Sequence, residues 1–357
     1  MVDFRTFQSA RREPCTALAP IVDPAGWSPD ELSDPAAFSY RLKAVDADDM
    51  LAAVAEVRRR GVDLVAIKKE DFPLPVFGAV LADVRRELAD GRGVVLLRGF
   101  PVGALDREGQ AIAYLGLGAH LGNAIQQNAQ GHVLGHVKDL GGDINDLHTR
   151  TYVTSAAIPF HNDNADYVGL LCLQTGKQGG ESRIASSVTI YNRILAGRPD
   201  LAEALCGEFA WTRHGETNPG EPAWHMQRVF NFADGYFTAR AAGLYVRKTQ
   251  GLPGVPPFTP AQEECLEYYP AVANECAVGM VFEPGDIQLL NNHVIVHSRT
   301  AFSDWPEPER MRHLLRLWIN DPTARPLPDY LKKGRARMGV QIDGVKPSAP
   351  LDVEVPA

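Results

Sequence analysis

Cysteine is scarce in this chain, and its spacing does not suit a disulfide framework or a metal ribbon. The 357 residues include five cysteines, an odd number, and no two of them form a CxxC pair. Disulfide-rich domains and zinc ribbons depend on paired or closely spaced cysteines, so we expect neither. Scattered thiols of this kind favour a reduced, cytoplasmic protein.

Long apolar runs and basic tracts are also missing. No stretch approaches the ~20 uninterrupted apolar residues of a membrane span, and the first residues carry charges where a signal peptide needs an apolar run. The formal net charge is −8, from 44 acidic and 36 basic residues. A chain without a basic cluster is a poor partner for nucleic acid. We therefore expect a small-molecule substrate, no membrane and no nucleic acid partner, and we leave a homo-oligomer open.

Signature motifs of several enzyme classes are absent as well. The chain has no G-x-S-x-G element of the kind that carries a hydrolase nucleophile. The glycines at 116, 118 and 122 follow an expected helix instead of a strand, which rejects a dinucleotide-binding loop. His132 and His136 form a HxxxH pair without the glutamate of a metalloprotease, so we interpret them as structural residues.

The remaining pattern predicts a mainly β protein with helical decoration, of the α+β class. Helices are expected at 46–60, 75–90 and 106–119, and an apolar strand at 94–97. From about residue 152 the chain changes to short β-like runs separated by turn residues, with helical inserts near 188–207 and 260–275. Several short strands with turns between them predict a sandwich or barrel. The expected strands are 166–174, 183–187, 209–214, 228–232, 235–240, 279–283 and 287–297.

No break in composition marks a domain boundary, so we expect one elaborated domain over residues 1–357. In this interpretation residues 1–90 form a lead-in and helices that pack on the core. Residues 91–320 form the core itself, and residues 321–357 form a C-terminal tail.

A histidine and a carboxylate two positions apart are the most informative feature of the sequence. On a β-strand, His161 and Asp163 project from the same face, because side chains alternate with period 2. A second histidine from a distant strand would complete two nitrogens and one oxygen on one side of a metal. Such a set leaves coordination positions open and suits non-heme Fe(II) and oxygen chemistry. Alone, the short motif also fits a polar surface turn.

The downstream half of this constellation lies in residues 284–319. A turn at 284–286 is followed by a strand in which His293 and His297 share one face, so either could supply the distant nitrogen. The next apolar strand places Arg312 and Arg316 on one face, where each needs an anion to offset the cost of burial. A planar guanidinium suits a bidentate carboxylate partner, from a ligand or from the protein itself.

Four ordered motifs resemble a known family. They are the segment Ile158-Pro-Phe-His-Asn-Asp, the turn Gly179-Gly-Glu-Ser182, the run 291–302 (NNHVIVHSRTAF) and the pair Arg312-x-x-x-Arg316. Together they resemble the Fe(II)- and 2-oxoglutarate-dependent dioxygenases of the taurine dioxygenase (TauD/TfdA) and clavaminate synthase type. The likeness covers roughly residues 90–320.

The resemblance implies a double-stranded β-helix, or jelly-roll, core of the cupin kind. It implies that His161, Asp163 and His297 are the iron ligands and catalytic centre. Arg312 matches the arginine that pairs with the far carboxylate of 2-oxoglutarate, and Ser182 matches a hydroxyl that helps to hold it. Arg316 matches an arginine that meets an anionic substrate group in some relatives.

The implied reaction uses Fe(II), 2-oxoglutarate and O2 to oxidise an unactivated C–H bond of a small organic molecule, in specialised metabolism. Succinate and CO2 are released, and the outcome is hydroxylation, desaturation or cyclisation. Halogenating relatives replace the carboxylate ligand with a small residue, so Asp163 argues against halogenation.

Position alone suggests further substrate contacts near the mouth of the barrel. These are Gln126, Asn128, Tyr152, Asn164 and Arg299. Two rival functions remain at this stage: a 2-oxoglutarate-independent metalloenzyme on a cupin-like barrel, and a non-catalytic barrel that binds a ligand. The paired arginines argue against the first rival, and an intact set of three metal ligands argues against the second.

Overall fold

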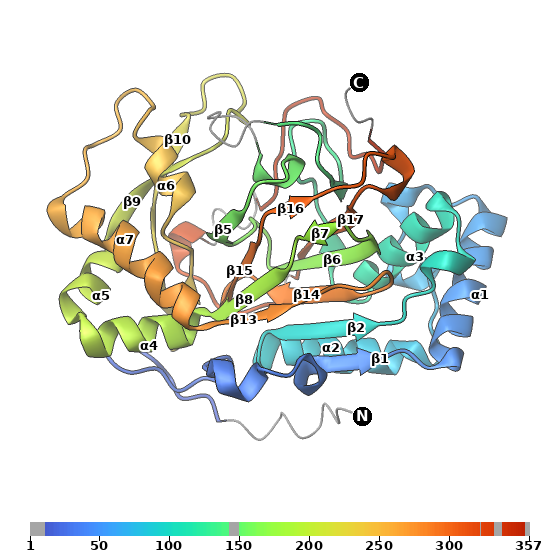
Figure 1. The fold of residues 1–357 in the computed structure, drawn as a ribbon, viewed down its shortest axis with the longest axis horizontal. Helices are drawn as coiled ribbons and strands as arrows, with labels where there is room; N and C mark the ends of the chain where they lie inside the picture. Colours follow the sequence, from blue (N-terminus) through green and yellow to red (C-terminus); the bar gives the residue numbers. More distant parts are fainter. Residues whose placement is uncertain (1–10, 143–149, 322, 332–337, 354–357) are drawn as a thin grey trace.

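The computed structural model describes residues 11–142, 150–321, 323–331 and 338–353. Two β-sheets form its centre, with helices at both ends of the molecule (Figure 1). Within the described ranges, no helix combines the length and the apolar character needed to cross a membrane.

The larger sheet has seven strands. Its order is β1 (Ser39–Arg41), β2 (Val94–Arg98), β14 (Ile287–Asn291), β6 (Tyr167–Gln174), β17 (His313–Asn320) and β3 (Asn123–Ala124), and β4 (Leu134–Val137) also pairs with β17. The β1–β2 pair is parallel and the other pairs are antiparallel. The N-terminal segment is therefore hydrogen-bonded into the same sheet as the predicted core.

The smaller sheet has the order β13 (Ala277–Met280), β8 (Ser182–Ser186), β15 (Ile295–Arg299) and β5 (Ile158–His161). The chain passes from the larger to the smaller sheet between β14 and β15, where residues 292–294 form a turn. The expected single strand at 287–297 was therefore wrong: it is two strands in two sheets. A pair of antiparallel sheets that exchange strands in this way is the predicted jelly roll.

Successive side chains of a strand in the larger sheet point alternately into two different apolar clusters, one on each face of the sheet. Val94 and Leu96 of β2 point into the apolar cluster between the sheets, whereas Val95 and Leu97 join a second cluster on the outer face. The helices of the second cluster are α1 (Ala44–Arg60), α2 (Phe77–Asp90) and α3 (Arg107–Ala119). Figure 1 shows them on the outer side of the larger sheet and around its edge.

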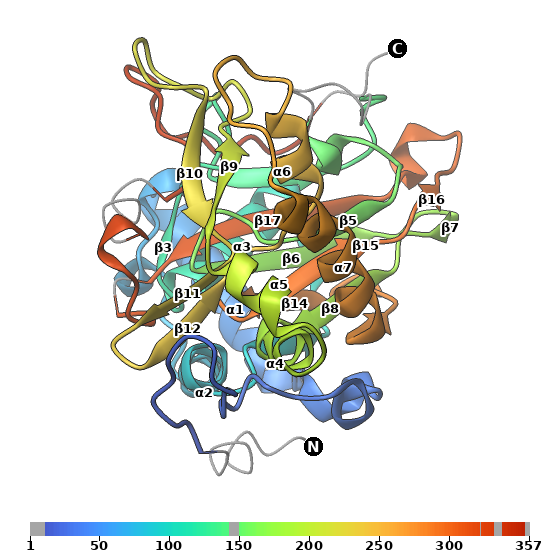
Figure 2. The same cartoon turned by 90° about the vertical axis from the view of Figure 1, so that its left-hand side faces the viewer.

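The opposite end of the molecule carries the inserts of the barrel. Figure 2 shows this end, with α6, α7 and the β9–β10 hairpin in front of the strands. The insert expected at 188–207 is two helices, because Pro199 opens the second one. The helices are α4 (Ser187–Gly197), α5 (Pro199–Leu205), α6 (Leu244–Thr249) and α7 (Pro260–Glu275), and the hairpins are β9 (Glu208–Thr212) with β10 (Trp224–Arg228) and β11 (Phe230–Ala233) with β12 (Tyr236–Ala239).

Short elements complete the fold. A two-stranded ribbon pairs β7 (Gln178–Gly179) with β16 (Phe302–Ser303). The 3-10 turns are Pro29–Leu32, Pro35–Phe38, Leu64–Ala66, Lys69–Asp71, Val102–Ala104, Thr151–Val153 and Pro308–Arg310.

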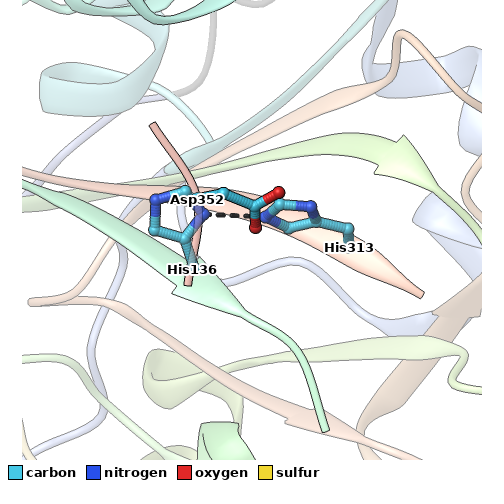
Figure 3. Close-up of side chains that lie close together, drawn as sticks. All are labelled: His136, His313 and Asp352. Carbon is cyan, nitrogen blue, oxygen red and sulfur yellow. Dashed lines mark hydrogen bonds between the residues drawn. The ribbon is translucent and has the colours of Figure 1, made fainter. Parts of the chain in front are cut away.

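A buried histidine pair fastens the C-terminal segment to the larger sheet (Figure 3). His136 of β4 and His313 of β17 join through Nδ1 and Nε2 at 2.8 Å, and Nε2 of His136 lies 2.8 Å from the Pro350 carbonyl. Asp352 approaches both rings, so that the three residues bring potential ligand atoms within 4.8 Å of one another. The Lys138 ammonium, 3.7 Å from Asp352, opposes a second cation there. We therefore interpret the cluster as an anchor; His132 instead bonds Asn128.

This anchor makes stability depend on pH in a definite direction. Burial lowers the pKa of His136, and it lowers the pKa of His313 to about 3, from the ~6.5 of an unfolded chain. Because the unfolded chain binds these protons more readily, the contribution of the pair is present above pH ~6.5 and is lost as the pH falls.

We predict that the double variant His136→Gln/His313→Gln is less stable than the parent by about 2 kcal/mol at pH 7.5, since two buried hydrogen bonds change. This difference should shrink between pH 7 and pH 5. Urea unfolding curves of both proteins at several pH values measure it. A difference that stays constant with pH would contradict the assignment.

Candidate active site

Antiparallel pairing of β5 with β15 sets His161 directly opposite His297. The centroids of the two imidazole rings are 4.2 Å apart. His161 is the last residue of β5, so Asp163 lies beyond the strand and not on it as the sequence suggested. The carboxylate therefore reaches the histidines because the strand ends at His161 and a short turn follows, and not because side chains alternate along a strand.

Two asparagines fix this turn. Asn162 donates through Nδ2 to the carbonyls of Asn292 and Ile295, both at 2.8 Å, and its Oδ1 accepts from the Ala241 N–H at 2.8 Å. The side-chain oxygen of Asn292 accepts from the Asp163 N–H at 3.1 Å. The backbone around Asp163 is thus tied to the turn between β14 and β15. Neither asparagine could be assigned this role from the sequence, because an asparagine in a turn is usually a surface residue.

The charges around Asp163 suit a bound cation. Its Oδ1 lies 3.2 Å from Nη1 of Arg316, while Oδ2 is buried without a hydrogen-bond partner, 3.9 Å from Nε2 of His297. Burial alone would raise the pKa of Asp163, but Arg316 and the two histidines hold it below its usual value. Burial lowers the pKa of His161 and lowers that of His297 to about 3. At neutral pH the set is therefore one carboxylate and two neutral imidazoles.

This donor set fits Fe(II). Two imidazole nitrogens and one carboxylate oxygen on one side of an ion are the ligands of non-heme iron oxygenases, and the buried Oδ2 of Asp163 could serve as that oxygen. The potential ligand atoms of His161, Asp163 and His297 do not all lie within 4.8 Å of one another. Within the part of the chain that the structure describes, only His136, His313 and Asp352 have all ligand atoms within 4.8 Å of one another.

His293, the alternative distant histidine, is committed elsewhere. It is completely buried, with Nε2 2.7 Å from Asp166 and Nδ1 2.8 Å from the Thr238 hydroxyl. It lies in the turn between β14 and β15 and therefore does not share a strand face with His297. The geometry leaves His297 as the histidine that faces His161.

Two buried arginines, Arg299 and Arg312, lie against the ring of Phe302. The guanidinium carbons of Arg299 and Arg312 lie 4.7 and 5.1 Å from the centre of its ring. Arg299 donates to the carbonyls of Thr154 and Ala156, but its Nε and Nη1, and Nη1 of Arg312, are buried without partners. Burial lowers the pKa of Arg299 to about 9 and that of Arg312 to about 10. A carboxylate would relieve both of these unpaired charges.

The double-glycine turn makes room for this site. Gly180 has φ +76°, and a Cβ there would stand 2.9 Å from Nε of Arg312. Ser182, two residues later, pairs in register with Arg299 and donates its hydroxyl to Gln288 Oε1 at 3.1 Å. Ser182 and Arg299 are therefore neighbours in the smaller sheet, and Arg312 lies against the glycine turn that leads into it.

Arg316 already has an anion partner in Asp163. Its Nε also donates to Gln127 Oε1 at 2.7 Å, and its guanidinium lies over Tyr152 at 4.4 Å and Trp318 at 4.8 Å. Gln127 is 1% exposed and was missed, because nothing in the sequence distinguishes a buried glutamine from a surface one.

The other predicted contacts are engaged with the protein. The Gln126 amide donates to the Val345 carbonyl at 3.4 Å, and that of Asn164 to the Gly339 carbonyl at 3.3 Å. Asn128 bonds the backbone and ring of His132 at 3.1 Å. These three side chains are absent from the lining of the cavity beside His161.

That cavity is small, with an interior volume of about 30 Å³, and it is partly open to solvent. Several lining residues, on β9 and in the segment after β12, were not predicted from the sequence. The complete lining is Thr151, Ile158, Pro159, Phe160, His161, Asn162, Trp211, Arg240, Ala241, Leu244 and Tyr245. A predicted iron ligand therefore forms part of the wall of a mainly apolar cavity.

Known structures share this fold. An asparagine oxygenase in complex with Fe(II), 2S,3S-3-hydroxyasparagine and succinate is 19% identical, with a TM-score of 0.62, over 85% of this chain and 98% of that chain. The non-heme iron oxygenase OrfP in complex with Fe, succinate and (3S)-hydroxy-L-Arg is 14% identical, with a TM-score of 0.60, over 81% and 99%. At these identities the likeness shows the jelly-roll fold.

Sequence comparison gives the family. FR-33289 synthase of Streptomyces rubellomurinus is 30% identical over 325 residues, 88% of this chain and 95% of that protein. Taurine hydroxylase-like protein SAT17 of Stachybotrys chartarum is 29% identical over 330 residues, 88% and 84%. Residues 59–318 match the family described as "Taurine catabolism dioxygenase TauD, TfdA family". The chain therefore belongs to the TauD/TfdA dioxygenases, non-heme iron enzymes that use 2-oxoglutarate and O2.

Proposed function

We propose that the cavity beside His161 is the active site, in which the enzyme oxidises a C–H bond of a small organic molecule. The observation that carries this proposal is the meeting of His161, Asp163 and His297 beside two buried arginines that lack an anion. Iron, 2-oxoglutarate and O2 supply the oxidising power when bound, with release of succinate and CO2.

The protein residues then have separate tasks. His161, Asp163 and His297 would hold the metal and leave its other positions to ligands. Arg316 and Gln127 keep the Asp163 carboxylate in place, since one guanidinium contacts both of them. His161 Nδ1 lies 3.0 Å from the Pro159 carbonyl, a contact that would fix the tautomer and leave Nε2 free to bind the metal.

Arg312, Arg299 and Ser182 bind the cosubstrate. The far carboxylate of 2-oxoglutarate would accept from the guanidinium N–H groups that now lack partners, while Gly180 allows the close approach of Arg312. Arg299, predicted from sequence as a substrate contact, is better suited to this carboxylate because it lies beside Arg312.

Hydroxylation is the outcome that these residues favour. The Asp163 carboxylate leaves no vacancy for a halide, and the mainly apolar cavity beside His161 keeps water from the reacting carbon. Two structural neighbours are complexes with hydroxylated amino acids, and the similarity to FR-33289 synthase supports a role in specialised metabolism.

We predict that Asp163→Ala and His297→Ala abolish the binding of Fe(II), because each removes one of three ligands. Anaerobic titration with Fe(II) and 2-oxoglutarate, followed through the weak visible band of the chelate, measures this. His120→Ala is the matched control, since His120 lies at the end of α3 and bonds the Phe72 carbonyl, and it should keep the band. A band of normal strength in Asp163→Ala would reject the iron assignment.

We predict that Arg312→Met raises the KM for 2-oxoglutarate about 10- to 100-fold, the range expected for loss of a charged hydrogen bond. Arg299→Met should act in the same direction and less strongly, because one of its nitrogens serves the Thr154 carbonyl. Succinate release at varied 2-oxoglutarate gives the KM values. The exposed Arg228→Met serves as control. Turnover that needs no 2-oxoglutarate would instead favour a cosubstrate-independent metalloenzyme.

A further inference from the structure

The C-terminal segment, residues 338–353, begins beside the proposed iron site. The N–H of Gly339 donates to the Asn164 carbonyl, and the N–H of Val340 donates to the Gln126 carbonyl, both at 2.9 Å. Asn164 directly follows the aspartate of the proposed iron ligands, and Gln126 directly precedes the buried glutamine that contacts the same aspartate through an arginine. Two consecutive N–H groups of the C-terminal segment therefore connect two distant stretches of the chain.

The same two stretches also meet inside the barrel, through Arg316. Its Nη1 lies 3.2 Å from Asp163 Oδ1, and its Nε donates to Gln127 Oε1 at 2.7 Å. Gln127 Nε2 in turn donates to the carbonyls of Val133 and Arg316, at 2.9 and 2.8 Å. The side chains of Arg316, Asp163 and Gln127 are all buried. The position of the carboxylate therefore depends on the separation of the two stretches, and the C-terminal segment fixes this separation from the other side.

The start of the segment fits closely against the core. Gly339 has φ +78°, and a Cβ there would stand 2.4 Å from the Gln126 carbonyl oxygen. Met338 and Val340 are buried, and Val340 belongs to the apolar cluster between the two sheets. Gly344 has nearly the same backbone conformation, φ +79°, but a Cβ there would meet no atom within 4 Å. Only the first of these two glycines is required by its surroundings.

Further attachments hold the rest of the segment. Asn218, in the loop between β9 and β10, donates through Nδ2 to the Gln341 carbonyl at 3.1 Å and accepts from the Asp343 N–H at 2.7 Å. At the far end, His136 Nε2 lies 2.8 Å from the Pro350 carbonyl, within the buried histidine pair of Figure 3. The segment is therefore fixed at its start, in its middle and at its end.

We propose that residues 338–353 act as a brace of the iron site, in which Gly339 and Val340 hold two stretches of the chain at the separation that places the Asp163 carboxylate for the metal. None of these described residues lines the cavity beside His161, so the role of the brace is positioning. This inference rests on the proposed function, because it concerns how a ligand of the same site is held. Brace and metal then stabilise each other by the same factor, since coupling between two sites is reciprocal.

Gly339→Ala and Gly344→Ala form a matched pair of variants. Both place a side chain at a positive φ, so their backbone costs are alike, but only Gly339→Ala drives a Cβ into the Gln126 carbonyl. Gly339→Ala should raise the Kd for Fe(II) about 10-fold, the lower end of the range for residues that orient metal ligands. Gly344→Ala should bind iron as the parent does. Anaerobic titration of the chelate band, at a temperature where circular dichroism shows both variants folded, gives the Kd values.

Hydrogen exchange in the parent protein tests the coupling without any variant. The N–H groups of Gly339 and Val340 exchange when the brace detaches, which is a local opening. Under anaerobic conditions, Fe(II) with 2-oxoglutarate should slow exchange in residues 338–343 about 10-fold, the factor expected from the iron titration, because the coupling is reciprocal. The turn Lys69–Asp71, which packs among the helices on the other face of the larger sheet, should exchange at one rate with and without metal.

Each outcome decides one of the two proposals. The brace is overturned, while the chelate band still supports the oxygenase, if Gly339→Ala binds iron as tightly as Gly344→Ala does. It is also overturned if the metal leaves exchange at 338–343 unchanged or slows the turn Lys69–Asp71 equally. Absence of the band in the parent protein overturns the proposed function instead. If Gly339→Ala does not fold, the exchange measured in the parent decides.

Discussion

The hydrogen-bonded pairing of β5 with β15 is the constraint on which the site depends. It brings together two segments that are remote in sequence and sets His161 opposite His297. The turn at 292–294 moves the chain from one sheet to the other, and Asn162 and Asn292 bond across it. A change in this register by one residue would turn His297 to the other face of its strand, and the three-residue set would not form.

β17 serves two structures at once. Its inward residues Arg316 and Trp318 contribute to the site, whereas His313 on the opposite face meets His136 and the C-terminal segment. The histidine pair that holds the C-terminal segment and the arginine that holds the Asp163 carboxylate therefore lie on the same strand. Packing of the strand against α3 and β4 holds both in position, so the helical end of the molecule supports the chemistry without touching it.

The sequence predicted the fold class, the family and the main helices, because these follow from periodicity and from ordered motifs. The alternation in the last strand was also right: Leu314 and Trp318 face one core, and Leu315 and Leu317 the other. Strand alternation failed for His161 and Asp163, since the strand ends between them. The iron ligands and cosubstrate residues stay predictions from the resemblance.

Arg240 and Gln127 could not be found from sequence, because their importance lies in what surrounds them. A guanidinium next to alanines is usually a surface group, and only its burial in the cavity wall makes it unusual. The Asn292 carbonyl accepts from both Arg240 and Asn162. Asn292 bonds a side chain of the cavity wall, the Asn162 amide and the Asp163 N–H at once, so a substitution at position 292 would disturb the cavity wall and the carboxylate together.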